Sequence, residues 1–307
     1  PLRLAEMIFR RTSQEGLTWR EIDACQRERK RLAHDKPREE TVRSEEFRPA
    51  RIAAIVACRM KSSRLRRKAL KPIQGVPSVE RCLQQCFGMP SVSQVILATS
   101  DLEDDAVLAD YLCDGRASFW AGDPDDLISR YLGACDHYGV DVVVRITADC
   151  PVVSPEILEY LLREHFASGA DYTAAAVASV GTAGEIIEAS ALREIMRRVD
   201  RAEQSEYMTW YFRNNPDIFR VNIVDLPPEL VRPYRLTLDH AEDLEMFEEL
   251  FRHLGPGADA HPLSRVFEIM DSHPEIASLN SHIETKYVVD KELIALLDRV
   301  TRLPVTR

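Results

Sequence analysis

Cations and hydroxyls are concentrated in the segment Arg-Met-Lys-Ser-Ser-Arg-Leu-Arg-Arg-Lys, which spans residues 59–68. The apolar run at 52–57 comes just before it and predicts a buried strand, whereas the next helix is expected only after Pro77. The segment is therefore predicted to be a loop at the carboxyl end of a strand, where parallel α/β sheets bind their ligands. Hydroxyls, loop amides and cations in that place suit a nucleoside triphosphate. The alternative, a solvated basic loop without a ligand, has the same composition and stays open on these residues alone.

Two carboxylates follow apolar runs in matching contexts. Asp149 closes residues 145–149 and Asp239 closes residues 235–239, and both segments read Arg, apolar residue, Thr, one further residue, Asp. Carboxylates at two adjacent strand ends suit Mg²⁺, which takes one or two carboxylates together with phosphate oxygens and water. Either aspartate alone is better explained as a helix cap or turn former. The matched pair, downstream of a cationic loop, favours the magnesium site.

Two further segments are weaker candidates for nucleotide contacts. Thr99, Ser100 and Asp101 follow the apolar run at 95–98 and offer polar groups to a ribose or a base, but an N-cap explains them equally well. Gly122 opens a Gly-Asp-Pro-Asp-Asp segment. Its acidic residues are also favoured by the dipole of a following helix, without any function.

Alternating strand and helix patterns from residue 51 onward predict the elements that would position these side chains. Such alternation is typical of an α/β domain with a mostly parallel sheet flanked by helices. Strands are predicted at 52–57, 95–98, 118–120, 140–146, 171–177, 185–188, 219–224 and 234–238. Helices are predicted at 78–87, 103–113, 125–137, 154–166, 190–198, 204–214, 242–253, 263–270 and 291–300.

The first fifty residues differ in pattern from the rest. A capping-box signal at Thr18 predicts a helix over 19–34, and the charged stretch 34–49 reads as a linker. The predicted organisation is therefore a helical appendage at 1–50 followed by one nucleotide-binding domain at 51–307. The appendage is interpreted as an arm that packs on its own domain or on a twin subunit. A docking module for another protein is the alternative.

Composition and missing motifs weaken several classes of function. The net charge of −10 argues against general nucleic-acid binding. No apolar run approaches the roughly 20 residues of a membrane helix, and the N-terminus lacks the apolar core of a signal peptide. Seven cysteines without a Cys-x-x-Cys motif indicate neither a disulfide framework nor structural zinc. The absence of Gly-x-Ser-x-Gly, Walker and Gly-x-Gly-x-x-Gly motifs weakens hydrolase, P-loop and dehydrogenase hypotheses. A cytoplasmic location is expected.

In their order along the chain, these motifs resemble the cytidylyltransferase superfamily that makes CMP-activated sugar acids, including the CMP-Kdo and CMP-N-acetylneuraminate synthetases. The resemblance is closest to the spore-coat polysaccharide SpsF-type family. That pattern begins Ala-Arg-Met-Gly-Ser-Thr-Arg-Leu-Pro-Gly-Lys, and residues 58–68 read Cys-Arg-Met-Lys-Ser-Ser-Arg-Leu-Arg-Arg-Lys. The resemblance extends over about residues 51–282, with further matches at 71–73, 98–100, 122–126, 130–131, 142–151 and 235–239. It implies a Rossmann-like nucleotidyltransferase fold of the GT-A-like type.

The resemblance also implies a role for each matching residue. The expected catalytic set, with the two aspartates as magnesium ligands, is Arg59, Lys68, Asp149 and Asp239. Nucleotide contacts are expected from Arg59, Ser62, Ser63, Lys68, Thr99, Ser100, Asp101 and Gly122. Contacts to the acceptor substrate are expected from Arg145, Glu188, Glu206 and Arg235.

Several positions depart from the family pattern. Lys61 replaces a glycine, and Arg66-Arg67 replace a Pro-Gly pair, so the loop is more basic than the pattern. Ala148 replaces the glycine before the first aspartate, and Tyr207 replaces a histidine. These departures bear on the acceptor more than on the nucleotide.

The resulting hypothesis is a Mg²⁺-dependent nucleotidyltransferase. An oxygen of a sugar acid, sugar phosphate or phosphonate would attack the α-phosphorus of CTP, or of another NTP, and pyrophosphate would leave. One alternative is a glycosyltransferase that uses a nucleotide-sugar donor. Another is a nucleotide-binding interaction subunit without catalysis. The expected partners are the nucleotide, a small anionic acceptor and a second copy of the chain, with neither nucleic acid nor membrane.

Overall fold

A computed structural model describes residues 50–62, 64–256, 259–284 and 290–304. The predicted helical appendage and Ser63 lie outside these residues. One compact unit comprises Ala50–Ile283 together with the chain from Ala295 onward, and the fold below is that of this unit. The domain boundary near residue 50 stays a prediction.

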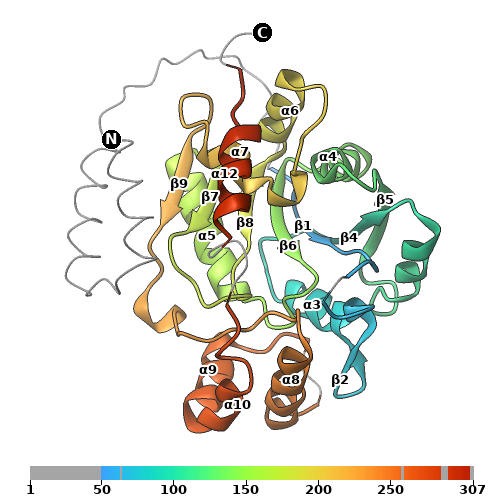
Figure 1. The fold of residues 1–307 in the computed structure, drawn as a ribbon, viewed down its shortest axis with the longest axis vertical. Helices are drawn as coiled ribbons and strands as arrows, with labels where there is room; N and C mark the ends of the chain where they lie inside the picture. Colours follow the sequence, from blue (N-terminus) through green and yellow to red (C-terminus); the bar gives the residue numbers. More distant parts are fainter. Residues whose placement is uncertain (1–49, 63, 257–258, 285–289, 305–307) are drawn as a thin grey trace. The chain divides into compact units, whose positions relative to one another are not determined.

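The centre of the unit is a seven-stranded sheet in the order β5-β4-β1-β6-β8-β7-β9 (Figure 1). The pairs β5–β4, β4–β1 and β1–β6 are parallel, β8 is antiparallel to both of its neighbours, and β7–β9 is parallel. A separate hairpin is formed by β2 and β3. The strands are β1 (Ile52–Ala57), β2 (Pro72–Ile73), β3 (Val76–Pro77), β4 (Gln94–Ser100), β5 (Ser118–Gly122), β6 (Val142–Thr147), β7 (Tyr172–Ala175), β8 (Glu185–Glu188) and β9 (Val221–Val224).

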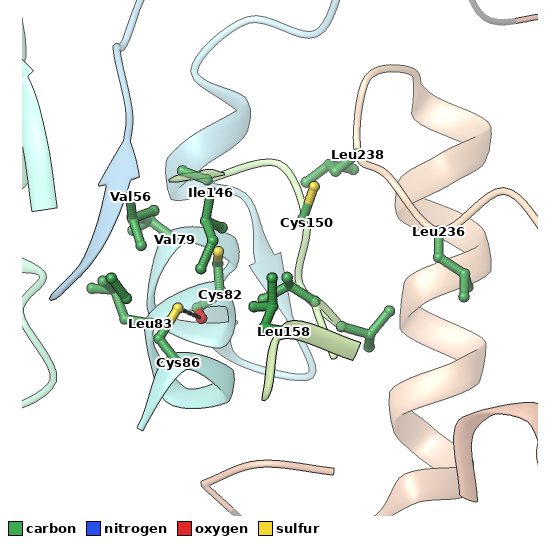
Figure 2. Packing of buried hydrophobic residues seen from close by; sticks show 14 of the residues in the cluster. Val56, Val79, Cys82, Leu83, Cys86, Ile146, Cys150, Leu158, Leu236 and Leu238 are labelled. Atoms are coloured by element: carbon green, nitrogen blue, oxygen red, sulfur yellow. Dashed lines mark hydrogen bonds between the residues drawn. The ribbon is translucent and has the colours of Figure 1, made fainter. Parts of the chain in front are cut away.

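The central strands are continuous apolar runs because helices cover both faces of the sheet. Successive residues of β1 alternate between two clusters: Ala54 and Val56 belong to one, and Ala53 and Ile55 to the other. The first cluster contains side chains of α3 (Ser78–Cys86), α5 (Pro155–Ser168), α8 (Ala241–Leu254) and α9 (Leu263–Ser272). The second contains those of α4 (Leu127–Tyr138), α6 (Ala189–Arg198) and α7 (Thr209–Arg213). Figure 2 shows Val56 in the first cluster beside residues of α3.

The helices begin and end where their capping residues stand. Asp126 accepts hydrogen bonds from the backbone of the first turn of α4, and Ser154 does the same for α5 with proline at N1. The α-helices are α3 (Ser78–Cys86), α4 (Leu127–Tyr138), α5 (Pro155–Ser168), α6 (Ala189–Arg198), α7 (Thr209–Arg213), α8 (Ala241–Leu254), α9 (Leu263–Ser272), α10 (Pro274–Ser278) and α12 (Lys291–Val300). Short 3₁₀ helices are Lys68–Leu70, Glu103–Asp110, Ser205–Tyr207 and Pro228–Leu230.

Three predicted elements differ from the structure. The predicted helix at 103–113 is a 3₁₀ helix that spans only Glu103–Asp110, and the predicted helix at 204–214 is a 3₁₀ turn followed by α7. The predicted strand at 234–238 is not a strand. Its only ladder contact among the described residues is an isolated bridge between Arg235 and Val180, because its other backbone neighbour is the loop at Asp149.

Candidate active site

The carboxyl ends of four parallel strands meet at one edge of the sheet. Ala57, the last residue of β1, pairs with Ala98 of β4 and with Thr147 of β6, while Ser100 pairs with Gly122 of β5. The loops that leave these strands therefore start side by side. This is the edge at which open α/β sheets bind their ligands.

Lys68 and the two predicted metal-binding aspartates form one cluster at this edge. The Nζ atom of Lys68 lies 2.7 Å from Oδ2 of Asp149 and 2.8 Å from Oδ1 of Asp239. The side chains are 19%, 23% and 12% exposed, so the cluster is recessed but open to a ligand. The structure thus joins the basic loop and both carboxylates at a single point.

Asp239 reaches this point because the segment before it runs beside Asp149. The backbone N–H of Leu238 donates to the carbonyl of Asp149 at 2.8 Å, and the Thr237 hydroxyl donates to the same oxygen at 3.2 Å. On the other side Gly181, with φ of 88°, packs against the segment. A Cβ at Gly181 would lie 2.0 Å from the carbonyl oxygen of Leu236, so only glycine permits the approach.

Arg235 holds Asp239 from behind instead of facing the edge. Its guanidinium donates to both carboxylate oxygens of Asp243, at 2.9 and 3.0 Å, and lies 3.4 Å from Oδ2 of Asp239. Asn280 completes the buried network with bonds to Asp243 and to the Arg235 carbonyl. The predicted contact between Arg235 and the acceptor stays untested; the structure shows a positioning role for this side chain.

Arg64 adds a cation to which the sequence patterns assigned no role. Its Nη2 atom lies 2.8 Å from Oδ1 of Asp239, the same oxygen that Lys68 contacts. The Arg64 side chain is 44% exposed and stands on the solvent side of the cluster. Asp239 is therefore approached by two cations of the basic loop.

Charges in the cluster stabilise one another against the cost of burial. Burial lowers the pKa of the Lys68 ammonium, but Asp149 and Asp239 outweigh it and raise this pKa above its ordinary value. Burial raises the pKa of the Asp149 carboxyl, but the charge and hydrogen bond of Lys68 outweigh it and hold this pKa below its ordinary value. Lys68 and Asp149 are both ionised at neutral pH as a result.

Arg59, Glu206 and Arg145 form a second cluster at the start of the loop. Arg59 donates to the carbonyl of Pro124 at 2.7 Å and forms an ion pair with Glu206. Arg145 donates to the backbone carbonyl of Glu206 at 3.3 Å and pairs with Glu185 at 2.8 Å. Sequence reasoning missed Glu185. Three of the predicted site residues are thus brought together here, next to the segment that follows β5.

The nucleotide candidates at the end of β4 are engaged in different ways. The Ser100 hydroxyl donates to Asp105, whose other oxygen accepts the backbone N–H of Met60 at 2.6 Å. Asp105 was not predicted, and it ties the basic loop to β4. The buried Thr99 hydroxyl has no hydrogen-bond partner among the described residues. The N–H of exposed Asp101 donates to the Gly122 carbonyl at 2.9 Å, which fixes the two strand ends together.

Glu188 is the predicted residue that the structure does not bring to this edge. It pairs with Val142, the first residue of β6, whereas Asp149 follows the last residue of that strand. At about 3.3 Å per residue, the length of β6 separates the two. The Glu188 carboxylate lies 3.2 Å from buried His165 instead.

Ser62, a predicted nucleotide contact, lies in the basic loop, where its hydroxyl accepts the Leu65 N–H at 3.4 Å.

The donor set at Lys68 fits a magnesium ion that also binds a nucleotide. Among the described residues, no three His, Cys, Asp or Glu side chains are grouped as metal ligands. Asp149 and Asp239 converge on one ammonium, so they offer two oxygen ligands to a cation in that place. Mg²⁺ commonly uses one or two carboxylates and takes the rest of its ligands from phosphates and water.

Comparison with known proteins decides the family. The family model described as cytidylyltransferase matches residues 53–270, which include both clusters. The chain belongs to the cytidylyltransferase family. The predicted resemblance and the α/β nucleotidyltransferase fold are thereby confirmed. The match begins at residue 53, after the predicted appendage, and ends at residue 270.

Individual relatives of this cytidylyltransferase cover most of its length. It is 30% identical over 233 residues to the spore coat polysaccharide biosynthesis protein SpsF of Bacillus subtilis, covering 74% of this chain and 97% of that protein. A cytidylyltransferase structure from Leptospira borgpetersenii matches with a TM-score of 0.69 and 22% identity, over 77% of this chain and 100% of that one. A CMP:2-keto-3-deoxy-manno-octonic acid synthetase complexed with CTP matches with a TM-score of 0.51 and 16% identity, over 66% and 98% of the two chains.

Among the described residues of this cytidylyltransferase, no helix combines the length and the apolar composition that a membrane crossing requires.

Proposed function

We propose that this cytidylyltransferase transfers CMP from CTP to an oxygen of a small anionic acceptor, with Mg²⁺ as the metal and pyrophosphate as the second product. The acceptor classes are a sugar acid, a sugar phosphate and a phosphonate. The observation that carries the proposal is the convergence of Lys68, Asp149 and Asp239 at the carboxyl edge of the sheet. It provides carboxylate oxygens for a metal and a cation for phosphates in one place.

The chain's own residues would act by binding and by electrostatics. Arg59 and Lys68, at the two ends of the basic loop, bind the triphosphate, and Ser62 and Ser63 contribute loop groups near it. Asp149 and Asp239 hold the magnesium ion. When bound, that ion neutralises the charge that develops on the phosphates. No covalent intermediate with the protein is required, because fixed charges stabilise the transition state.

The remaining site residues divide between nucleotide and acceptor. Thr99, Asp101 and Gly122 lie where the ends of β4 and β5 meet, which supports contacts to the nucleoside. Arg145, within β6, lies with Glu206 and Arg59 in the second cluster, which supports contacts to the acceptor. Glu188 is not included, because the register places it at the opposite end of β6.

Pyrophosphate release tests the proposal directly. Purified protein with Mg²⁺ is incubated with each of the four NTPs and a panel of sugar acids, sugar phosphates and phosphonates. The expected result is pyrophosphate release that depends on both CTP and one acceptor class, with a CMP-linked product by mass spectrometry. Release of a free nucleoside diphosphate from a nucleotide sugar would instead indicate a glycosyltransferase. Nucleotide binding without any product would overturn catalysis.

A further inference from the structure

The proposed metal ligands already hold cations that belong to the protein. Oδ1 of Asp239 is 2.8 Å from Lys68 and 2.8 Å from Arg64, and Lys68 also reaches Asp149 at 2.7 Å. Two carboxylates and two loop cations are thus electrically balanced. Both cations come from the basic loop, not from the sheet or from α8.

The same groups are assigned to two different ligands in the proposed function. Lys68 is expected to bind the triphosphate, and the carboxylates are expected to bind the divalent metal. An ammonium that touches both carboxylates occupies the space between them, and its charge repels a second cation there. At a few ångströms, this repulsion weakens the binding of a second cation by roughly tenfold or more.

We propose that Lys68 and Arg64 are placeholder cations, which occupy the metal-binding carboxylates until a triphosphate draws them away. The proposal rests on the proposed function and adds its order of events. The phosphates offer Lys68 and Arg64 new anionic partners, and their departure leaves Asp149 and Asp239 open to the metal. Metal affinity is therefore low in the free protein and rises when the nucleotide is bound.

The two side chains are suited to such an exchange. Lysine carries a compact charge on a flexible four-carbon stem and can turn its donors without moving the backbone. Arg64 is 44% exposed, so it can swing into solvent without leaving a cavity. Arg235 behaves differently, because its bonds to buried Asp243 keep it in place behind Asp239. Asp239 therefore keeps a fixed support while its two solvent-side partners leave.

Binding of Mn²⁺ to the nucleotide-free protein tests the proposal without any activity measurement. Mn²⁺ stands in for Mg²⁺, and free Mn²⁺ is followed by its electron paramagnetic resonance signal at pH 8. Wild type is expected to bind weakly. Lys68→Met, which keeps the length of the side chain and removes its charge, is expected to bind at least about tenfold more tightly. Arg64→Gln should tighten binding by a smaller factor.

Two matched variants isolate the charge at the carboxylates. Lys68→Arg keeps the charge and should bind Mn²⁺ as weakly as wild type. Lys71→Met removes a cation three residues farther along and should leave Mn²⁺ affinity unchanged. Circular dichroism and thermal unfolding show whether each variant is folded. If Lys68→Met does not fold, Arg64→Gln decides, because its exposed side chain can change without disturbing the core.

The outcomes separate this inference from the proposed function. Folded variants that bind Mn²⁺ no more tightly than wild type overturn the placeholder role. Tight binding by wild type that equals Lys68→Met overturns it as well. Failure of the proposed function appears elsewhere, as the absence of pyrophosphate release from CTP with every acceptor. Tighter Mn²⁺ binding by Lys68→Met would support the placeholder role even then.

Discussion

Arg235 and Asp243 form a buried ion pair directly behind Asp239. Both carboxylate oxygens of Asp243 accept from the Arg235 guanidinium, and Oδ2 also accepts the backbone N–H groups of Asp239 and His240 at 2.9 Å each. The pair therefore links the first turn of α8 to the segment that carries Asp239. The carboxylate of Asp239, at the edge of the sheet, is thus held in place by the fully buried carboxylate of Asp243.

Asp243→Asn should destabilise the protein strongly. The substitution leaves the buried Arg235 guanidinium without its charged partner, and breaking a buried pair costs about 3–5 kcal/mol. Urea unfolding measures the change. Asp271→Asn is the matched control, since it removes a surface pair with Arg232 and should cost at most about 1 kcal/mol. Equal stability losses in the two variants would contradict the structural role of Asp243.

Asp149→Asn and Asp239→Asn should each remove most turnover and leave the fold intact. Loss of charge stabilisation at the phosphates corresponds to roughly 10²–10³ in kcat. Pyrophosphate release at limiting Mg²⁺ measures the effect. Asp136→Asn, at an exposed pair with Arg193, should retain wild-type rates. A variant that turns over normally would exclude that aspartate from the metal site.

Arg59→Ala and Lys68→Ala should weaken the use of CTP far more than Arg66→Ala or Arg67→Ala. Arg59 and Lys68 lie in the two clusters, whereas Arg66 and Arg67 are exposed and line an open groove of about 430 Å³ with Leu70. The KM for CTP in the pyrophosphate assay compares the four variants. Larger effects at Arg66 and Arg67 would show that the phosphates bind along this groove.

The pKa shifts of Lys68 and Asp149 predict that the difference in unfolding free energy between wild type and Lys68→Met depends on pH. The Asp149 pKa is lowered in the folded state, so its contribution is present above its unfolded value of 3.8 and is lost as pH falls through the folded pKa. The Lys68 pKa is raised, so its contribution is present below 10.5 and is lost as pH rises through the folded pKa. The stability gap between wild type and Lys68→Met should therefore be widest between about pH 4 and pH 10. Urea unfolding across this range measures it, and a gap independent of pH would contradict the pairing.

Removal of residues 1–50 should change assembly and not chemistry. The helix predicted at 19–34 needs a surface to pack on, because a segment of this length has too little core to be stable alone. A chain that starts at Arg51 is expected to release pyrophosphate at near-normal rates, while light scattering shows an altered oligomeric state if wild type is a homodimer. Loss of activity in a truncated protein that stays folded would place the appendage in the active site.

The sequence was informative where one strand or one loop determines a position. The apolar runs of β1 and β6 predicted parallel strands, and Asp149 had to stand at the end of one of them. The matching pattern before Asp239 predicted a place beside Asp149, and both carboxylates do contact Lys68, although no strand forms before Asp239. Its segment is held by hydrogen bonds to Asp149 and Val180, which come from loops that no local pattern places beside it.

Contacts between distant segments explain why the position of Glu188 and the roles of Asp105 and Asp243 could not be predicted from the sequence. β8 runs antiparallel to β6, so its last residue, Glu188, lands at the wrong end for the site. Strand direction is set by tertiary packing and leaves no mark in an apolar run of this length. Asp105 and Asp243 look like ordinary helix-start acids in the sequence, and only burial among distant partners distinguishes them.

The Lys68–Asp239 contact spans 171 residues of chain. When synthesis has reached residue 238, the basic loop and Asp149 have been made, but Asp239 has not. Asp239 also needs Asp243 and Asn280 behind it, so α8 and the turn after α10 must be synthesised before the site takes shape. Chains that stop before Asn280 are therefore expected to lack a formed site, and the proposed use of CTP can begin only after this residue has been synthesised.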